Sequence, residues 1–167
     1  MGEFWYVASP YSLYVYGKET AAREVGMAAL ELAKRGFSVF SPIAHSHAMC
    51  LTAPKLKDDA LFWELQDRPF LETAMGLIVV KMRGWSESIG VEHEIARSRE
   101  MGKPIMYLEW DDESRTDIDE GGFTDSGDPE RSAWRAAGKL SDDSGNVVPI
   151  VGDQGDADAS GTVYGPA

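Results

Sequence analysis

Short apolar runs alternate along most of the chain with longer segments whose apolar residues recur every three or four positions. The apolar runs cover residues 4–9, 37–40, 77–82 and 105–108, and the segments of helical spacing cover 19–35, 61–74 and 88–101. Short runs closed by Ser-Pro or Gly are typical of buried strands, and the longer spacing is typical of amphipathic helices. The order β-α-β-α-β-α-β predicts an α/β fold in which a parallel sheet carries helices on both faces, in three layers.

Two parts of this pattern are irregular. Residues 43–60, which carry two of the three histidines, show no clear period before the next helix and are expected to be irregular. Further on, Asp67-Arg68-Pro69 interrupts the helical spacing. Because proline is favourable in the first turn of a helix, Asp67 or Arg68 is expected to lie just before a helix that begins at Pro69.

The composition changes after residue 110. The residues that follow are dense in Asp, Glu, Gly and Ser and contain few apolar residues. Within this part, residues 132–140 are expected to form a short helix and residues 147–151 an edge strand. We therefore expect a folded domain over residues 1–109 and an acidic, partly flexible extension over residues 110–167.

The composition fits one acidic globular domain. The chain has 167 residues, of which 43% are hydrophobic, and a formal net charge of -12. This charge argues against nucleic acid or an anionic membrane as the partner, although a local cluster of donors can still hold a small anion. The single cysteine, Cys50, allows no internal disulfide and is expected to be a packed thiol. No apolar run reaches the ~20 residues of a membrane span, and a cytoplasmic location is expected.

The stretch from Gly84 to Ala96 carries the strongest candidate chemistry. It follows the apolar run Leu77–Val80 and opens a helix, and a helix N-terminus at the carboxyl end of a strand offers unpaired N–H groups to a ligand. Glu94 falls next to the apolar stripe of this helix, so its carboxyl group is expected near the strand ends. Glu92 is a rival on similar grounds, and the alternative is a capped helix start with two solvated glutamates.

Asp67 and Tyr6 are the candidate partners of Glu94. Two carboxyl groups that face one pocket can divide the work, one ionised as a nucleophile and the other protonated as an acid. A tyrosine hydroxyl at the carboxyl edge of the sheet can hold a carboxylate in place. The simpler interpretations are a helix cap for Asp67 and a core position for Tyr6.

Histidine and aromatic residues near the same edge suggest a pocket for a flat heterocycle. His45 and His47 lack the further ligands that a zinc site needs, so no metal is expected and the histidines are assigned to the pocket lining. Tyr11 and Trp85 fall in expected loops at this edge, where a base can stack. No Gly-rich phosphate loop is present, so the residues alone predict an α/β domain with an acidic pocket.

Several of these motifs occur in a characteristic order. They are Tyr6-Val7-Ala8-Ser9-Pro10-Tyr11, Phe40-Ser41-Pro42, Asp67, Leu77–Val80, Ser88-Ile89-Gly90-Val91-Glu92-His93-Glu94 and Gly102-Lys103-Pro104. Together they resemble the nucleoside 2-deoxyribosyltransferase-like superfamily, and within it a small branch from phages and bacteria, over roughly residues 4–109. The resemblance implies a flavodoxin-like doubly wound fold and cleavage of an N-glycosidic bond.

The resemblance also implies roles for single residues. Glu94 would attack the anomeric carbon and form a glycosyl ester, Asp67 would protonate the departing base, and Tyr6 would position Glu94. Ser88 is similar to the serine that helps hold the phosphate in nucleoside 5′-monophosphate N-glycosidases. The other residues expected to bind substrate are Gly90, Ser9, Pro10, Tyr11, His45 and Trp85.

The expected function is therefore cleavage of the N-glycosidic bond of a nucleoside or nucleoside 5′-monophosphate, with hydrolysis favoured over transfer to another base. The implied partner is this small molecule, no cofactor is implied, and a homodimer or larger homo-oligomer is expected. One alternative is a non-catalytic nucleotide-binding sensor or accessory module of the same fold. Another is an interaction protein that works through its acidic tail.

Overall fold

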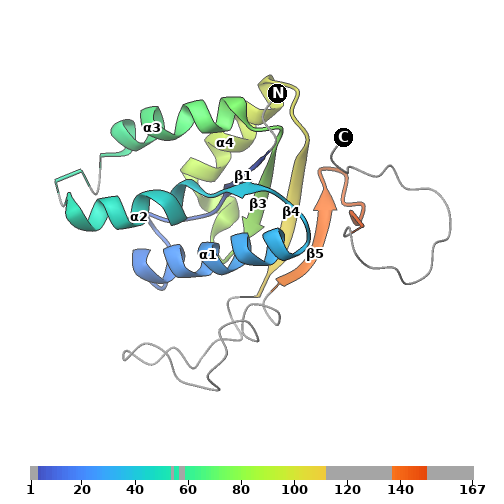
Figure 1. The fold of residues 1–167 in the computed structure, drawn as a ribbon, viewed down its shortest axis with the longest axis horizontal. Coiled ribbons are helices and arrows are strands. Elements are labelled where there is room, and N and C mark those ends of the chain that lie inside the picture. Colours follow the sequence, from blue (N-terminus) through green and yellow to red (C-terminus); the bar gives the residue numbers. More distant parts are fainter. Residues whose placement is uncertain (1–3, 54, 57–58, 112–136, 150–167) are drawn as a thin grey trace, which may run out of the picture.

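The computed structural model describes residues 4–53, 55–56, 59–111 and 137–149 (Figure 1). In this part of the chain a five-stranded sheet is flanked by four α-helices. The strands are β1 (Trp5–Ala8), β2 (Val39–Phe40), β3 (Gly76–Lys81), β4 (Ile105–Trp110) and β5 (Ala137–Asp142). The helices are α1 (Lys18–Lys34), α2 (Pro42–Thr52), α3 (Ala60–Thr73) and α4 (Ile89–Glu100), with a short 3-10 helix η1 (Trp85–Glu87) before α4.

The strands lie in the order β2-β1-β3-β4-β5. The first four are parallel, and β5 runs antiparallel to β4 at the edge of the sheet (Figure 1). The predicted α/β fold is confirmed, because the order 2-1-3-4-5 is that of a flavodoxin-like doubly wound sheet. Ligands of such sheets bind outside the carboxyl ends of the strands where the strand order reverses, which is here between β1 and β3.

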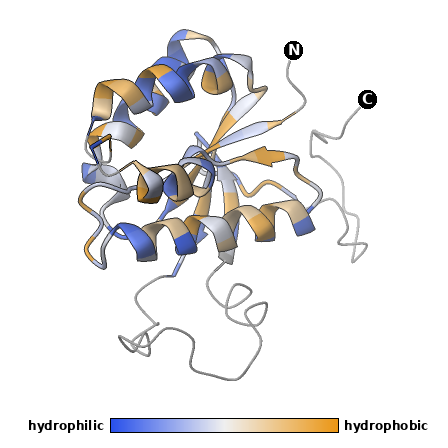
Figure 2. Cartoon of the chain, turned by 60° about the vertical axis from the view of Figure 1, so that its left-hand side comes forward, coloured by the Kyte–Doolittle hydropathy of each residue, from blue (hydrophilic) through white to orange (hydrophobic). Residues whose placement is uncertain are grey.

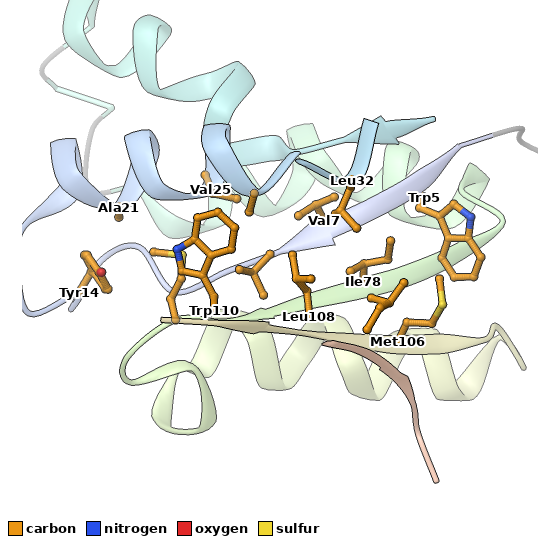
Figure 3. Close-up of a cluster of buried hydrophobic side chains, with 14 residues drawn as sticks. Trp5, Val7, Tyr14, Ala21, Val25, Leu32, Ile78, Met106, Leu108 and Trp110 are labelled. Carbon is orange, nitrogen blue, oxygen red and sulfur yellow. The ribbon is translucent and has the colours of Figure 1, made fainter. Parts of the chain in front are cut away.

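Alternate side chains of β1 to β4 enter two separate cores. Trp5 and Val7 of β1 pack toward α1 in the cluster drawn in Figure 3, whereas Tyr6 and Ala8 pack toward α3 and α4. This division follows from the two-residue period of a strand. Along α1, Figure 2 shows both blue and orange residues, as expected of an amphipathic helix. None of the helices in the described ranges is long and apolar enough to span a membrane.

The histidine segment is helical, which corrects the expectation of an irregular stretch. α2 begins at Pro42, and the Ser41 side chain caps it by accepting a hydrogen bond from the Ala44 backbone N–H at 3.2 Å. Serine at the cap and proline in the first turn form a strong helix start, which the weak apolar period of this segment obscured. Cys50 is buried on this helix, so the prediction of a packed thiol is confirmed.

α3 runs without a break through Pro69, which corrects the prediction of a helix start there. The cap is Asp59, whose side chain accepts a hydrogen bond from the Phe62 backbone N–H at 3.0 Å. Asp67 is therefore an interior residue of the helix and not its cap. Proline removes one backbone hydrogen bond from a helix interior, and the packing of Leu71 against the sheet helps to compensate for it here.

The edge strand lies earlier in the chain than expected. It covers residues 137–142, where the end of a helix was expected, and not residues 147–151. Val147 contributes only an isolated bridge to Ser141. Residues 132–136 of the expected helix and most of the expected flexible tail lie outside the described residues. Because β5 pairs with β4, part of the C-terminal extension belongs to the sheet.

A buried carboxylate fixes the end of β4. Glu24 on α1 is fully buried and accepts a hydrogen bond from the indole Nε1 of Trp110 at 2.8 Å. Loss of a buried hydrogen bond to a carboxyl group destabilises the fold, so we expect Trp110→Phe to lower the free energy of unfolding by about 2 kcal/mol in urea titrations. The control is Trp63→Phe. In the wild-type protein the Trp63 indole donates a hydrogen bond to the Leu56 carbonyl near the surface. Equal losses in the two variants would contradict this interpretation.

Candidate active site

Tyr6 of β1 and Glu94 of α4 meet on the face of the sheet that α3 and α4 cover. Tyr6 of β1 is 1% exposed, and its hydroxyl donates a hydrogen bond to Oε1 of Glu94 at 2.8 Å. Burial raises the pKa of Glu94 to about 8, although the Tyr6 hydrogen bond acts in the opposite direction. Glu92 is exposed on the same helix, so of the two candidate glutamates only Glu94 faces the sheet. A carboxyl group that titrates near neutrality is suited to nucleophilic or proton-transfer chemistry.

Asp67 of α3 completes a group of three. Its charge raises the pKa of both Glu94 and Tyr6, so all three side chains lie within electrostatic reach of one another. Burial raises the pKa of Asp67 to about 6. Its Oδ1 atom is buried and has no hydrogen-bond partner among the described residues. Buried polar atoms are nearly always paired in native proteins, and a bound ligand would supply the missing partner.

The Tyr6 hydroxyl acts as a fixed donor in this group. Burial, followed by the charges of Glu94 and Asp67, raises the pKa of Tyr6 far above its ordinary range. The hydroxyl therefore keeps its proton at all working pH values and favours the ionised form of Glu94.

An aromatic pair lies beside Asp67. The rings of Phe40 and Phe70 are stacked at 4.2 Å between centroids, and Phe70 follows Asp67 by one helical turn. His45 of α2 is exposed, and its ring lies 5.6 Å from Phe40 and 6.4 Å from Phe70. His45 and Asp67 thus flank the same apolar surface. Sequence patterns gave no sign of this stack, because its two residues are thirty positions apart.

The charge of His45 acts on Asp67. A protonated His45 lowers the pKa of Asp67, against the effect of burial. We therefore expect His45→Gln to raise the pKa of Asp67 above about 6, followed through the ¹³C shift of its carboxyl group in NMR titrations. His93→Gln is the control, because His93 does not act on this pKa. The coupling is refuted if the two variants shift the pKa of Asp67 equally or if neither shifts it.

The loop after β1 starts at the carboxyl end of that strand. Ser9 and Pro10 are buried, and Ser9 Oγ has no partner within the described ranges. The Tyr11 hydroxyl forms a hydrogen bond with Nδ1 of His47 at 2.9 Å, and the Lys18 ammonium lies 5.5 Å from the Tyr11 ring centroid. Tyr11 is therefore tied to α1 and α2, and its predicted role as a stacking surface for the substrate stays a prediction. The contact with His47 was not predicted.

The start of α4 contains the remaining predicted residues. The Ser88 side chain accepts a hydrogen bond from the Val91 backbone N–H at 3.5 Å and caps the helix. A Cβ atom at Gly90 would lie 4.0 Å from its nearest neighbour, so the protein alone does not require glycine there. The Trp85 ring packs edge-on against Tyr107 at 5.8 Å and is partly buried. Ser88 and Gly90 thus border an open helix start, whereas Trp85 is largely engaged in packing.

Comparison with known protein families gives a match that covers the first four strands. Residues 3–110 match a family model described as a domain of unknown function, DUF1937. No curated protein matches the chain. The matched residues include β1 to β4 and the whole Tyr6–Asp67–Glu94 group, whereas β5 lies beyond them. The resemblance to nucleoside deoxyribosyltransferases is not tested by this match and stays a prediction. The chain belongs to the DUF1937 family, and its candidate active site lies within the region that defines the family.

Proposed function

We propose that the protein is an N-glycosidase that cleaves a nucleoside or nucleoside 5′-monophosphate, with water favoured over a second base as the acceptor. The observation that carries the proposal is the buried Tyr6–Glu94 hydrogen bond beside a second carboxyl group, Asp67, with one unpaired oxygen. The position of this group at the strand-order reversal of a doubly wound sheet supports it. The resemblance to the deoxyribosyltransferase-like superfamily assigns complementary roles to the same residues.

The proposed reaction has two steps. In the first, a Glu94 carboxylate oxygen bonds to the anomeric carbon while the C–N bond breaks, and the base leaves with the bonding electrons and the proton of Asp67. In the second, water attacks the anomeric carbon and the Asp67 carboxylate accepts its proton. The ester bond breaks, and the sugar and the Glu94 carboxylate are released. Tyr6 holds the attacking carboxylate in place throughout.

The proposal predicts a bell-shaped pH dependence of kcat/KM. Below the pKa of about 6 both carboxyl groups carry protons, so no nucleophile is available. Above the pKa of about 8 both are ionised, so no acid is available for the base. Between these values the pair holds one proton, which rests mainly on Glu94 because its pKa is the higher of the two. The reactive form, with Glu94 ionised and the proton on Asp67, is a minority whose share is largest near the middle of this window, so activity should be highest there. A rate that is flat through both limbs would contradict the proposed division of roles.

The deciding assay uses a panel of ribo- and deoxynucleosides and their 5′-monophosphates. The protein is incubated with each compound, and free base is measured by chromatography. We expect at least one compound to release its base in a reaction that depends on Glu94. Release from none of them would overturn the proposal. Thermal stabilisation by a nucleotide without any base release would instead favour the non-catalytic binding module.

A further inference from the structure

The helix that carries Asp67 is weakly held along much of its length. Of the 14 residues of α3 only Leu71 is buried, and Leu61 and Leu65 are 63% and 54% exposed. Pro69 has no backbone N–H, so the hydrogen bond to the Leu65 carbonyl is missing one turn from the carboxyl end. The position of Asp67 therefore depends on the contacts that hold the last turn of α3 in place.

An ammonium group from elsewhere in the chain closes that last turn. Nζ of Lys103 donates hydrogen bonds to the carbonyl oxygens of Leu71 at 2.8 Å and Glu72 at 2.7 Å, and also to that of Ala74. The last carbonyl groups of a helix have no partner within the helix and carry a partial negative charge. One cation thus satisfies three of these acceptors at once.

Lys103 is itself fixed to the helix of the proposed nucleophile. It lies in the turn after α4, next to Gly102 with φ +64°, and its backbone N–H donates to the Ser98 carbonyl at 3.0 Å. The same residue therefore joins the C-terminal ends of α3 and α4. Arg97 and Glu72 form a second link between these helices, but this ion pair is exposed on both sides and is expected to contribute little.

We propose that Lys103 is a positioning residue that sets where Asp67 stands relative to Glu94. This role rests on the proposed function, because it concerns the acid and the nucleophile of that reaction. Misplacement of a catalytic group by about 1 Å can cost roughly a hundredfold in rate. Gly102-Lys103-Pro104 is one of the motifs that carry the family resemblance, and the resemblance implies no role for the side chain of Lys103.

The test compares Lys103→Met, which keeps most of the side-chain length, with wild type in the full chain. We expect kcat for an ordinary nucleoside to fall roughly tenfold to a hundredfold, with KM changed less than kcat. In kcat/KM, which reports only the steps up to base departure, a purine nucleoside methylated at N7 should be much less affected, because its base departs without protonation. The carboxyl groups of Asp67 and Glu94 should also influence each other's titration less, as measured by ¹³C NMR. The other groups acting on their pKa values, His45 and Tyr6, are unchanged in the variant.

Two further variants keep the proposal open to refutation. Arg97→Met removes the exposed link between α3 and α4 and should leave kcat, the leaving-group dependence and both titrations unchanged. Lys103→Arg keeps the charge but cannot direct one nitrogen at three carbonyls. It should therefore fold and show a smaller loss of kcat and a smaller change in the Asp67 and Glu94 titrations than Lys103→Met. If Lys103→Met is folded with wild-type titrations, or is unfolded while Lys103→Arg behaves as wild type, the positioning role is wrong. If wild type cleaves no nucleoside, the proposed function fails, and the NMR titrations still decide whether Lys103 places the carboxyl pair.

Discussion

Glu94→Gln should lower kcat/KM for base release by about 10⁴-fold, as expected when a nucleophile is lost. Glutamine has nearly the same shape and can still accept a hydrogen bond from Tyr6, so the fold and the pocket should be retained. A neutral amide oxygen is a poor nucleophile for the anomeric carbon, and the glycosyl ester cannot form. Initial rates of base release at the pH optimum, with urea unfolding as a check of stability, provide the measurement.

The matched control is Glu92→Gln. Glu92 is exposed two residues before Glu94 on the same helix, so the variant removes the same charge from nearly the same place. We expect its kcat/KM to stay within about threefold of wild type, as for a surface charge away from the reacting atoms. If both variants lose activity equally, the loss reflects the charge at the start of α4 and not a nucleophile.

Asp67→Asn should have the second largest effect. An amide cannot donate the proton that the departing base needs, so kcat/KM for ordinary nucleosides should fall by about 10²- to 10⁴-fold. A nucleoside methylated at N7 of its purine needs no such proton and should lose far less kcat/KM, which reports only the steps up to base departure. Asparagine also removes the charge that raises the pKa of Glu94, so this pKa should move below about 8. Steady-state rates with the two substrate types and an NMR titration of Glu94 measure these effects.

Asp59→Asn is the control for this change. Asp59 lies at the start of the same helix, where its side chain caps the Phe62 backbone N–H, and asparagine is an equally good cap. The variant should retain wild-type rates with both substrate types. A loss of equal size for both substrate types in Asp67→Asn would indicate that Asp67 maintains the pocket and does not act as an acid.

Local patterns in the sequence were sufficient to predict the layers of the fold and one side of the site. The helical stripe of α4 predicts that Glu94 lies on the side that meets the sheet, and this inference depends only on the geometry of a single element. The contact of Tyr6 with Glu94 was expected from the family resemblance. A homo-oligomer and a cytoplasmic location were also expected. The fold of a single chain tests neither of them, so both stay predictions.

The features that sequence patterns missed depend on contacts between distant elements. The continuity of α3 through Pro69 depends on its packing and its anchored last turn, and local propensity alone favoured a break there. The stack of Phe40 on Phe70 and the reach of Lys103 to the end of α3 likewise join residues from different elements. No periodicity within one segment reports such contacts. The helical form of α2 was the exception, because its Ser-Pro start was visible and was interpreted only as a strand end.

The most direct test of the central claim is detection of the proposed glycosyl ester on Glu94. The protein is mixed with a nucleoside that it cleaves, quenched rapidly in acid, digested and analysed by mass spectrometry. We expect the peptide that contains Glu94 to carry one added pentosyl group, with fragmentation placing the group on Glu94, and we expect no such addition in Glu94→Gln. Base release at the wild-type rate with the pentosyl group on another residue, or undiminished release by Glu94→Gln, would contradict the claim.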